Sequence, residues 1–474
     1  MSNPALDPRK SPTAVTRRSQ VVHRPLGAPS GAPPYRAISG EELLQLPQLD
    51  RLSWRTRMAM RAVTRVLPFR ANHYVIDQLI DWDRVPDDPI FQLVFPQPGM
   101  LEVTDRARLH RLERAGEASA LAAAVRSLRW RLNPHPAGQV EHNVPTFEGR
   151  RLPGLQHKYR ETVLFFPAQG QTCHAYCSYC FRWPQFVGLD DLQFASREAG
   201  DLVGYLRAHP EVTSVLITGG DPMIMRAALL RRYLEPLLRA NLPGLTSIRI
   251  GTKSVAYWPQ RFVSDGDADE VLRLFEDVVA SGKSLALMAH YSHPRELSTA
   301  VAQRALARIR STGAVVRCQA PLIKHVNDDA ATWAELWRTE VRLGAVPYYM
   351  FVARDTGPRQ YFEVPLVRAW TIYRDALAAV SGLARTVRGP SMSTTAGKVV
   401  IDGVATVHGA QVLVMRYLQA RDPAWVGRPF FAALDAQASW FTQLRPAAGS
   451  PRLFFAAEAP QPSAQLITLR TGTG

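Results

Sequence analysis

The chain has 474 residues, of which 46% are hydrophobic and 21% are charged, so it can form one large core and is neither disordered nor fibrous in bulk. Lysine and arginine exceed aspartate and glutamate by 57 − 41 = 16, but the excess is spread out and accompanies no nucleic-acid-binding motif. Four cysteines exclude a disulfide framework, no apolar run reaches the ~20 residues of a membrane span, and no signal peptide opens the chain. We therefore expect a soluble, cytoplasmic protein that binds neither nucleic acid nor membrane.

The first third of the chain divides into two parts. Residues 1–38 are basic and rich in proline, which predicts a disordered tail. Residues 39–158 predict a mainly helical region, because apolar residues recur at helical spacing within 102–131, and residues 87–98 predict an extended break between helices.

Residues 159–360 show a different pattern, in which short β-rich runs alternate with helical stretches. The predicted strands are 162–167, 214–218, 247–251, 284–290, 314–320 and 347–353. Such alternation indicates parallel βαβ units and hence an α/β fold. Six units are too few for a closed eight-stranded barrel, so we predict an open (β/α)6 partial barrel.

Residues 361–445 predict a small C-terminal segment behind the barrel. A helix is expected over 365–380, followed by two short strands, 399–401 and 404–407. The dipeptide Asp402-Gly403 between these strands favours a hairpin turn. Residues 446–474 are rich in Pro, Ala, Gly and Ser and predict a flexible tail.

Three cysteines, Cys173, Cys177 and Cys180, follow the first predicted barrel strand with CxxxCxxC spacing. Catalytic sites of such barrels lie at the carboxyl ends of the strands. A [4Fe–4S] cluster takes four thiolates, so three leave one iron open to chelate S-adenosylmethionine (SAM). The spacing is typical of radical SAM enzymes. The alternatives are chance or a zinc site without its fourth ligand, for which His174 has the wrong geometry.

Other residues near these positions support a SAM site. Tyr179 precedes the last cysteine and is a candidate to pack against adenine. Gly219, Gly220 and Asp221 follow the second strand, where glycines let the backbone approach a ligand closely. The fourth cysteine, Cys318, is predicted to be a buried core residue.

At this point the sequence resembles the lysine 2,3-aminomutase family of radical SAM enzymes over roughly residues 70–410. The matching motifs besides the cysteines are Asp87-Asp88-Pro89-Ile90, Pro153-Gly154-Leu155-Gln156-His157-Lys158-Tyr159, Phe181-Arg182, Thr218-Gly219-Gly220-Asp221-Pro222, Arg249-Ile250-Gly251-Thr252, Pro259-Gln260-Arg261, His290-Tyr291-Ser292-His293-Pro294, Val326-Asn327-Asp328 and Pro347-Tyr348-Tyr349.

The resemblance implies an isomerase, an intramolecular aminotransferase that moves an α-amino group to the β-carbon of an amino acid through a 5′-deoxyadenosyl radical. Its implied cofactors are the [4Fe–4S] cluster, SAM and pyridoxal 5′-phosphate (PLP). Its implied partners are a free amino-acid substrate, a flavodoxin- or ferredoxin-type electron donor and, by association, further copies of the chain.

The resemblance also assigns roles to single residues. Lys398 occupies the place of the lysine that holds PLP as a Schiff base, and Arg182 the place of the arginine that binds the substrate carboxylate. Lys158 and Tyr159 match positions near PLP. The family's phosphate-binding arginine falls on Thr162, so Arg160 is predicted to replace it.

This chain departs from the lysine enzymes at the substrate side chain. Two aspartates that hold the lysine ammonium fall on Arg354 and Arg388, and Asp355 stands one place after the first. Two arginines repel an ammonium and favour a carboxylate. We therefore predict a glutamate-like substrate. A register shifted by one residue would restore Asp355, and both arginines could instead make structural ion pairs.

Three other functions are compatible with these motifs. The chain could be a radical SAM enzyme of another reaction type that has lost PLP, because its Lys398 loop carries Ser and Thr instead of a glycine run. It could also be an aminomutase that modifies a protein lysine, although its long N-terminal region argues against this. The non-enzyme alternative is an RNA-binding or Fe–S structural protein, motivated by the net charge of +16.

Overall fold

The computed structural model describes residues 34–134, 142–188, 194–447 and 453–455. Residues 1–33 of the predicted N-terminal tail and most of the predicted tail over 446–474 lie outside these residues. The prediction of disorder is wrong for the last residues of the first tail, because Ala37 and Ile38 begin strand β1 and Ile38 is buried. Within them, no helix is long and apolar enough to cross a membrane.

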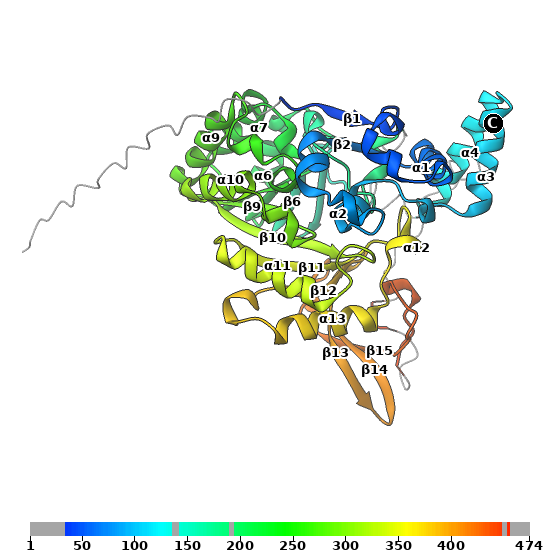
Figure 1. The fold of residues 1–474 in the computed structure, drawn as a ribbon. Coiled ribbons are helices and arrows are strands. Elements are labelled where there is room, and N and C mark those ends of the chain that lie inside the picture. The colour runs from blue at the N-terminus through cyan, green and yellow to red at the C-terminus, as the bar shows by residue number, and fades with distance from the viewer. Residues whose placement is uncertain (1–33, 135–141, 189–193, 448–452, 456–474) are drawn as a thin grey trace, which may run out of the picture. The chain divides into compact units, whose positions relative to one another are not determined.

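An eleven-stranded sheet is the centre of the fold (Figure 1). From one edge to the other it contains β15 (Pro429–Ala433), β14 (Ala410–Ala420), β13 (Gly397–Val407), β12 (Arg388–Ser393), β11 (Val346–Val352), β10 (Val315–Leu322), β9 (Ser284–His290), β8 (Ser247–Thr252), β7 (Ser214–Ile217), β6 (Thr162–Phe165) and β5 (Leu155–Tyr159). Strands β6 to β11 are parallel and adjacent in chain order, as an open (β/α)6 barrel requires. All six predicted strands are present within one or two residues.

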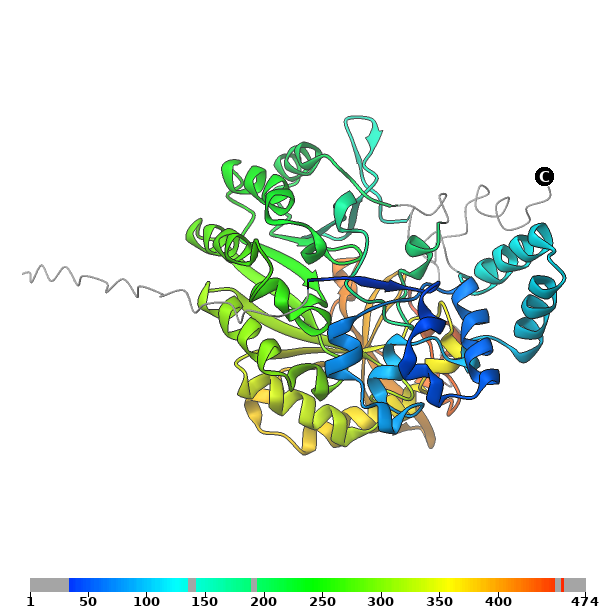
Figure 2. The ribbon, with the colours of Figure 1, turned by 45° about the horizontal axis from the view of Figure 1, so that its top comes forward.

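Helices follow each of these strands and cover the outer face of the sheet (Figures 1 and 2). They are α6 (Ala199–Ala208), α7 (Ala227–Arg239), α8 (Ser254–Tyr257), α9 (Ala268–Ala280), α10 (Ala300–Ser311), α11 (Ala330–Arg342), α12 (Arg359–Phe362) and α13 (Leu366–Ala378). In α9, for example, Val271, Phe275 and Val278 recur at helical spacing and are buried. This periodicity fixes which face of the helix packs on the sheet.

The N-terminal region is mainly helical. The predicted extended break over 87–98 is wrong in part, because the side chain of Asp88 caps a short helix at Pro89–Val94. The region contains α1 (Trp54–Val66), α2 (Pro89–Val94), α3 (Val103–Arg114) and α4 (Ala118–Arg131), together with the short strands β1 (Ala37–Ser39), β2 (Arg70–Asn72), β3 (Thr146–Phe147) and β4 (Arg150–Arg151). Its last residues form β5, which pairs antiparallel with β6 and so belongs to the central sheet.

The sequence-based prediction of two short C-terminal strands is wrong. Strand β13 runs without interruption through Asp402 and Gly403, where a register shift marks a bulge in its pairing with β14. The hairpin turn lies instead at His408 and Gly409, whose φ angles are 48° and 78°. Two successive positive φ angles are what a two-residue hairpin turn needs.

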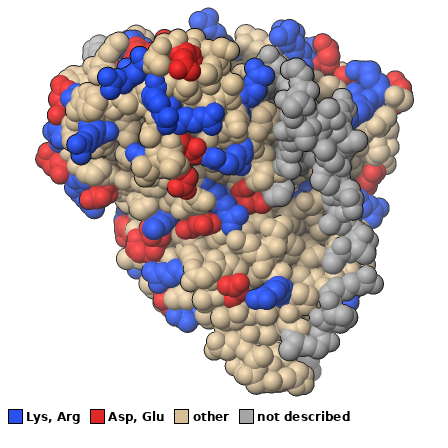
Figure 3. Space-filling model, turned by 90° about the vertical axis from the view of Figure 1, so that its right-hand side faces the viewer, with Lys and Arg blue, Asp and Glu red and all other residues tan. Residues whose placement is uncertain are grey.

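A second apolar core lies beneath the hairpin strands. Tyr417, Trp425 and Phe430 pack there with Phe454 and Phe455, two residues of the segment predicted to be flexible. On the face shown in Figure 3, basic and acidic side chains are interspersed over the upper part, whereas the lower part, formed by the hairpin strands, carries little charge.

Candidate functional site

The cysteine loop begins directly after β6, at the carboxyl end of the parallel strands. Cys173, Cys177 and Cys180 are free and partly buried, and the loop turns back on itself where the Cys180 amide donates to the Cys177 carbonyl at 3.0 Å. Burial raises the pKa of each thiol, that of Cys180 to about 12, and neighbouring cysteines raise the pKa of Cys173 and Cys180 further. The three side chains are therefore close neighbours, as the spacing predicts.

The chemistry of these donors fits an iron–sulfur cluster. Three crowded, enclosed thiols lose their protons only if positive charge lies among them, and iron supplies that charge. Within the described residues, no three His, Cys, Asp or Glu side chains converge closely enough for a single metal ion. A cluster places its ligands on different irons, so the arrangement suits a cluster better than zinc. His174 does not join the cysteines, because its Nδ1 is bonded to Ser254 Oγ at 2.8 Å.

The N-terminal region holds the cysteine loop through its backbone. Tyr176 N donates to the Arg70 carbonyl at 2.9 Å, and Ser178 N donates to the Leu93 carbonyl at 2.9 Å. Asn72 Nδ2 donates to the carbonyls of both His174 and Tyr257, at 3.1 and 3.0 Å. Sequence analysis missed Arg70 and Asn72, because no motif signals a contact made to backbone atoms.

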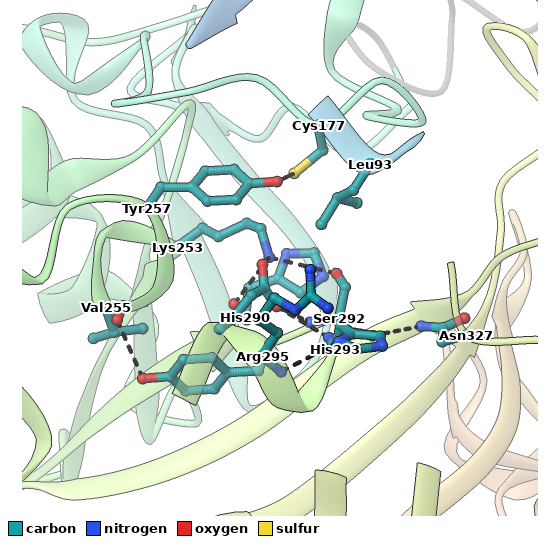
Figure 4. Close-up of polar contacts among 12 residues, drawn as sticks. Leu93, Cys177, Lys253, Val255, Tyr257, His290, Ser292, His293, Arg295 and Asn327 are labelled. Carbon is teal, nitrogen blue, oxygen red and sulfur yellow. Dashed lines mark hydrogen bonds and ion pairs between the residues drawn. The ribbon is translucent and has the colours of Figure 1, made fainter. Parts of the chain in front are cut away.

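Tyr257 of α8, in the segment after β8, contacts the cysteine loop. Its hydroxyl lies 3.2 Å from Cys177 Sγ, and Lys253 Nζ lies 4.5 Å from the centre of its ring (Figure 4). Lys253 also donates to Glu296 at 2.7 Å in a buried ion pair, and to the His290 carbonyl at 3.2 Å. A network of fixed polar groups thus runs from the cysteine loop to the end of β9.

Tyr179, predicted to contact adenine, is held by the same network. Its hydroxyl lies 3.0 Å from His290 Nε2 and 3.4 Å from Ser292 Oγ, and its ring meets Phe362 edge to face. Ser292 is itself held in place, because its carbonyl accepts a hydrogen bond from Asn327 Nδ2 at 2.9 Å (Figure 4). The contact of Tyr179 with adenine stays a prediction.

Gly219 and Gly220 lie against the start of the cysteine loop. A Cβ atom on Gly220 would lie 2.5 Å from Thr172 N, and one on Gly219 would lie 2.4 Å from Gln171 Nε2. Glycine is therefore required for packing against the loop, in addition to the predicted binding of SAM.

The carboxylate of Asp221 is fully engaged within the protein. It accepts hydrogen bonds from Thr252 Oγ1 at 2.8 Å, from the backbone of Lys253 at 2.8 Å, and from both N and Oγ of Ser254 at 2.9 Å. It also accepts from Met223 N at 2.9 Å. Asp221 therefore joins two strand loops through its carboxylate, and its predicted contact with SAM stays a prediction.

Lys398 lies at the start of β13, where it pairs with Ser393 of β12. Its Nζ lies 4.3 Å from the ring centre of Tyr349 and 5.4 Å from that of Phe351. Burial and the nearby Arg249, Arg388 and Arg354 lower its pKa to about 7. A lysine that is neutral near pH 7 is a nucleophile, as a residue that holds PLP must be.

The three residues predicted near PLP in this part of the chain lie in different environments. Lys158 Nζ donates to the Thr394 carbonyl, in the turn that leads to Lys398, and Tyr159 is buried beside it. Arg160 is exposed in the turn between β5 and β6. The structure therefore places Lys158 and Tyr159 beside the Lys398 loop, and it gives no support to Arg160 as the phosphate ligand.

Arg182 and Arg354 both lie in segments that follow barrel strands, Arg182 after the cysteine loop and Arg354 two residues after β11. The guanidinium of Arg182 lies over Phe166 at 4.6 Å and that of Arg354 over Phe181 at 4.9 Å. Arg182 donates to Gln171 Oε1 at 3.0 Å, but its buried Nε has no hydrogen-bond partner. Arg354 donates to the Ser393 carbonyl at 2.9 Å. An enclosed guanidinium with a spare donor fits a ligand carboxylate.

Arg388 and Asp355, the other two predicted side-chain residues, lie differently. Arg388 begins β12 and is exposed, with its guanidinium over the rings of Tyr348 and Tyr349. Asp355 is near enough to Arg354 to raise its pKa, although burial lowers that pKa overall. Both arginines lie near enough to Lys398 to lower its pKa, Arg388 from the start of β12 and Arg354 from the segment after β11.

The site as a whole has an excess of positive charge. Among the described residues, no salt bridge joins a carboxylate to any of the six basic side chains around the Lys398 loop, although Asp355 lies near Arg354. These side chains are those of Lys158, Arg249, Arg354, Arg388, Lys398 and Arg421. The site is therefore suited to anionic ligands.

Comparisons with known proteins agree with this geometry, although no family model matches the chain. A protein of Aquifex aeolicus (strain VF5) described as "Putative L-lysine 2,3-aminomutase" is 31% identical over 399 residues, which are 84% of this chain and 93% of that protein. One of Treponema pallidum (strain Nichols) with the same description is 30% identical, covering 69% of this chain and 86% of the relative. The L-lysine 2,3-aminomutase of Escherichia coli (strain K12) is 29% identical, covering 51% and 68%.

A solved radical SAM methyltransferase from Sphaerobacter thermophilus is 18% identical with a TM-score of 0.34, covering 49% of this chain and 68% of that one. This likeness is too weak to define the fold. The identity and coverage of the sequence relatives, in contrast, define the class of protein: a radical SAM isomerase of the aminomutase type, with a [4Fe–4S] cluster, SAM and PLP as its cofactors. The chain belongs to the lysine 2,3-aminomutase family. The predictions of fold class, reaction class and cofactors are confirmed.

We predict that Tyr257→Phe lowers the reduction potential of the cluster. The phenol is a hydrogen-bond donor to Cys177 Sγ, and such a bond stabilises the extra negative charge of the reduced cluster. A redox titration followed by electron paramagnetic resonance measures the shift. Tyr205→Phe is the control, because its hydroxyl is bonded to His157 instead. An unchanged midpoint in a Tyr257→Phe protein with full iron content would contradict the prediction.

Proposed function

We propose that this protein is a 2,3-aminomutase that acts on a free amino acid whose side chain ends in a carboxylate or another hydrogen-bond acceptor. The observation that supports this most is the gathering of cations around Lys398 without ion-paired carboxylates. A lysine substrate would bring a further ammonium into this site, and like charges repel in an enclosed region. A substrate with two carboxylates would neutralise part of the excess.

The bound cofactors would supply the difficult chemistry, since the cluster and SAM generate the radical while PLP carries the migrating nitrogen and delocalises the unpaired electron. Cys173, Cys177 and Cys180 would hold the cluster. Lys398 would attach PLP through its neutral amine, and the rings of Tyr349 and Phe351 exclude water from that amine.

Arg182 and Arg354 would orient the substrate. The spare donors of Arg182 suit the α-carboxylate, because a guanidinium can bind a carboxylate through two parallel hydrogen bonds. Arg354 is fixed by the Ser393 carbonyl and by Phe181, and it would bind the side-chain acceptor. Arg388 would contribute to the positive potential from the start of β12. The negative charge of Asp355 would partly offset the positive charge of Arg354.

The electron donor, the oligomeric state and the compartment belong to the same proposal. A flavodoxin- or ferredoxin-type protein would reduce the cluster, and copies of the chain would associate as a homo-oligomer. The cytoplasm suits the site, because three cluster ligands must remain reduced there.

Anaerobic turnover tests the proposed function. The reconstituted protein would receive SAM, PLP, a reductant and a mixture of common amino acids, and mass spectrometry after derivatisation would identify β-amino acids. We expect β-glutamate or another non-lysine product. We also expect Arg354→Gln to raise the KM for this substrate about tenfold or more, since one charged hydrogen-bonding partner is lost. Gln keeps a hydrogen-bond donor but lacks the charge and is shorter than Arg.

Other outcomes of that experiment distinguish the alternatives. β-Lysine as the main product would refute the acidic substrate and turn attention to Asp355. Cleavage of SAM to 5′-deoxyadenosine without any β-amino acid would favour a radical SAM enzyme of another reaction type. Activity on a protein lysine only would favour a protein-modifying aminomutase.

A pH profile tests the role of Lys398 separately. Its pKa is lowered from 10.5 to about 7, so the amine is protonated below pH 7 and neutral above it. We expect the rate of covalent PLP attachment to rise through pH 7 and to level off above pH 8, where about nine-tenths of the amine is neutral. Stopped-flow absorbance between pH 6 and 10 measures this rate. A rate that still rises toward pH 10 would show an ordinary lysine.

A further inference from the structure

Arg421 lies where the sequence offers no reason to expect a functional residue. It follows β14, and its backbone N donates to the Ala396 carbonyl at 3.0 Å. Its Nε donates to the Thr395 carbonyl at 3.0 Å, and its Nη2 contacts the His142 carbonyl at 3.3 Å and Asn143 Oδ1. These contacts fix the guanidinium against the turn that precedes Lys398, and Nη1 makes no hydrogen bond to the part of the chain that the structure describes.

Two further cations contact the same turn from other strands. Lys158 of β5 donates to the Thr394 carbonyl, and Arg354, after β11, donates to the Ser393 carbonyl at 2.9 Å. Three successive carbonyls, those of residues 393, 394 and 395, thus each receive a hydrogen bond from a different cation. Burial lowers the pKa of Lys158 far below its usual value, and Arg354, Arg421 and Lys398 lower it further. Such a gathering of like charges indicates a place for an anion.

The turn itself is shaped tightly. Thr394 N and Oγ1 both donate to the Gly397 carbonyl, at 2.8 and 3.0 Å. A Cβ atom on Gly397 would lie 2.3 Å from the Gln419 carbonyl oxygen, so only glycine lets β13 and β14 approach this closely. This approach brings Arg421, at the end of β14, beside Lys398, at the start of β13. The two residues are held in place by strand pairing, since Gly397 pairs with Ala420.

The residue predicted from the sequence to bind the phosphate lies at the surface, and within the described residues its side chain makes no hydrogen bond to this turn. Arg160 is exposed, and its carbonyl lies 3.1 Å from His157 Nε2. Thr162, at the family's arginine position, lies beside Arg249, whose Nη2 is 3.4 Å from its hydroxyl. A cation must therefore come from elsewhere in the chain.

We infer that Arg421 and Lys158 bind the phosphate of PLP. This inference rests on the proposed function, in which PLP is attached to Lys398. A phosphate dianion between an ammonium and a guanidinium offsets the repulsion around the turn, and a guanidinium binds phosphate oxygens through its planar set of donors. Arg421 thereby replaces, from a different strand, the arginine that is absent at position 162.

A comparison of PLP with pyridoxal, which lacks the phosphate, tests this inference. Both aldehydes would be titrated into the full-length protein without PLP, and binding followed by absorbance and fluorescence. We expect Arg421→Gln to weaken PLP binding at least about tenfold and to leave pyridoxal binding unchanged. Arg421→Lys should recover part of the affinity, because it keeps the charge. Arg160→Gln is the competing variant, and it should leave the affinity for both compounds as in the wild type.

Each other result overturns the inference. Equal loss of PLP and pyridoxal in a folded Arg421→Gln protein, verified by circular dichroism, would show that Arg421 only supports the turn. Unchanged PLP affinity, or a PLP-specific loss in Arg160→Gln, would place the phosphate elsewhere. A wild-type protein that binds pyridoxal and PLP equally well would also refute a phosphate site. A wild-type protein that binds neither would refute the proposed use of PLP, and with it this inference.

Discussion

The carboxylate of Asp221 is the interaction on which the candidate site depends most. The backbone N of Asp221 donates to the carbonyls of Gly170 and Thr172, at the start of the cysteine loop. Its carboxylate accepts hydrogen bonds from Thr252, Lys253 and Ser254, at the end of β8. One buried residue therefore joins the loops that follow β6, β7 and β8. Charged acceptors form the strongest hydrogen bonds, so several of them at one carboxylate fix the cysteine loop firmly.

The second organising feature is an imbalance of charge. Cysteine thiolates add negative charge at the carboxyl end of the barrel, and five basic side chains, those of Lys158, Arg249, Arg354, Arg388 and Arg421, gather around the Lys398 loop. Two unit charges at 4 Å interact by about 4 kcal/mol at an effective dielectric constant of 20, so the cations repel appreciably unless anions join them. Phosphate and carboxylate groups would supply these anions. The arrangement of basic side chains therefore favours anionic ligands such as those that the family uses.

Much of the fold could be predicted from the sequence, because strand and helix periodicities are local. All six barrel strands lie where β-branched runs alternate with helical stretches, and the three cysteines follow the first of them. The C-terminal hairpin was harder to predict, since Asp402-Gly403 favours a turn by itself, yet pairing with β14 keeps the strand continuous through a bulge. Tertiary pairing decided between two acceptable turn sites.

The site was less predictable than the fold, because its contacts join distant segments. Arg421 lies 263 residues beyond Lys158, and no local pattern shows that β5 and β14 end at the same turn. Asp221 is predicted to bind SAM, and the sequence does not show that five backbone and side-chain donors contact its carboxylate. The prediction for Arg160 rests on its nearness in sequence to Thr162, and sequence distance cannot show that Arg421 lies at the same turn as Lys158.

The most direct test of this account is to find which lysine carries PLP. The protein would be loaded with PLP, reduced with borohydride, digested, and its labelled peptide identified by mass spectrometry. The account predicts one labelled lysine, Lys398, and loss of the label in Lys398→Arg. A label on Lys158 instead, or no label on a protein that retains its cluster, would contradict the placement of PLP beside the cation-rich turn.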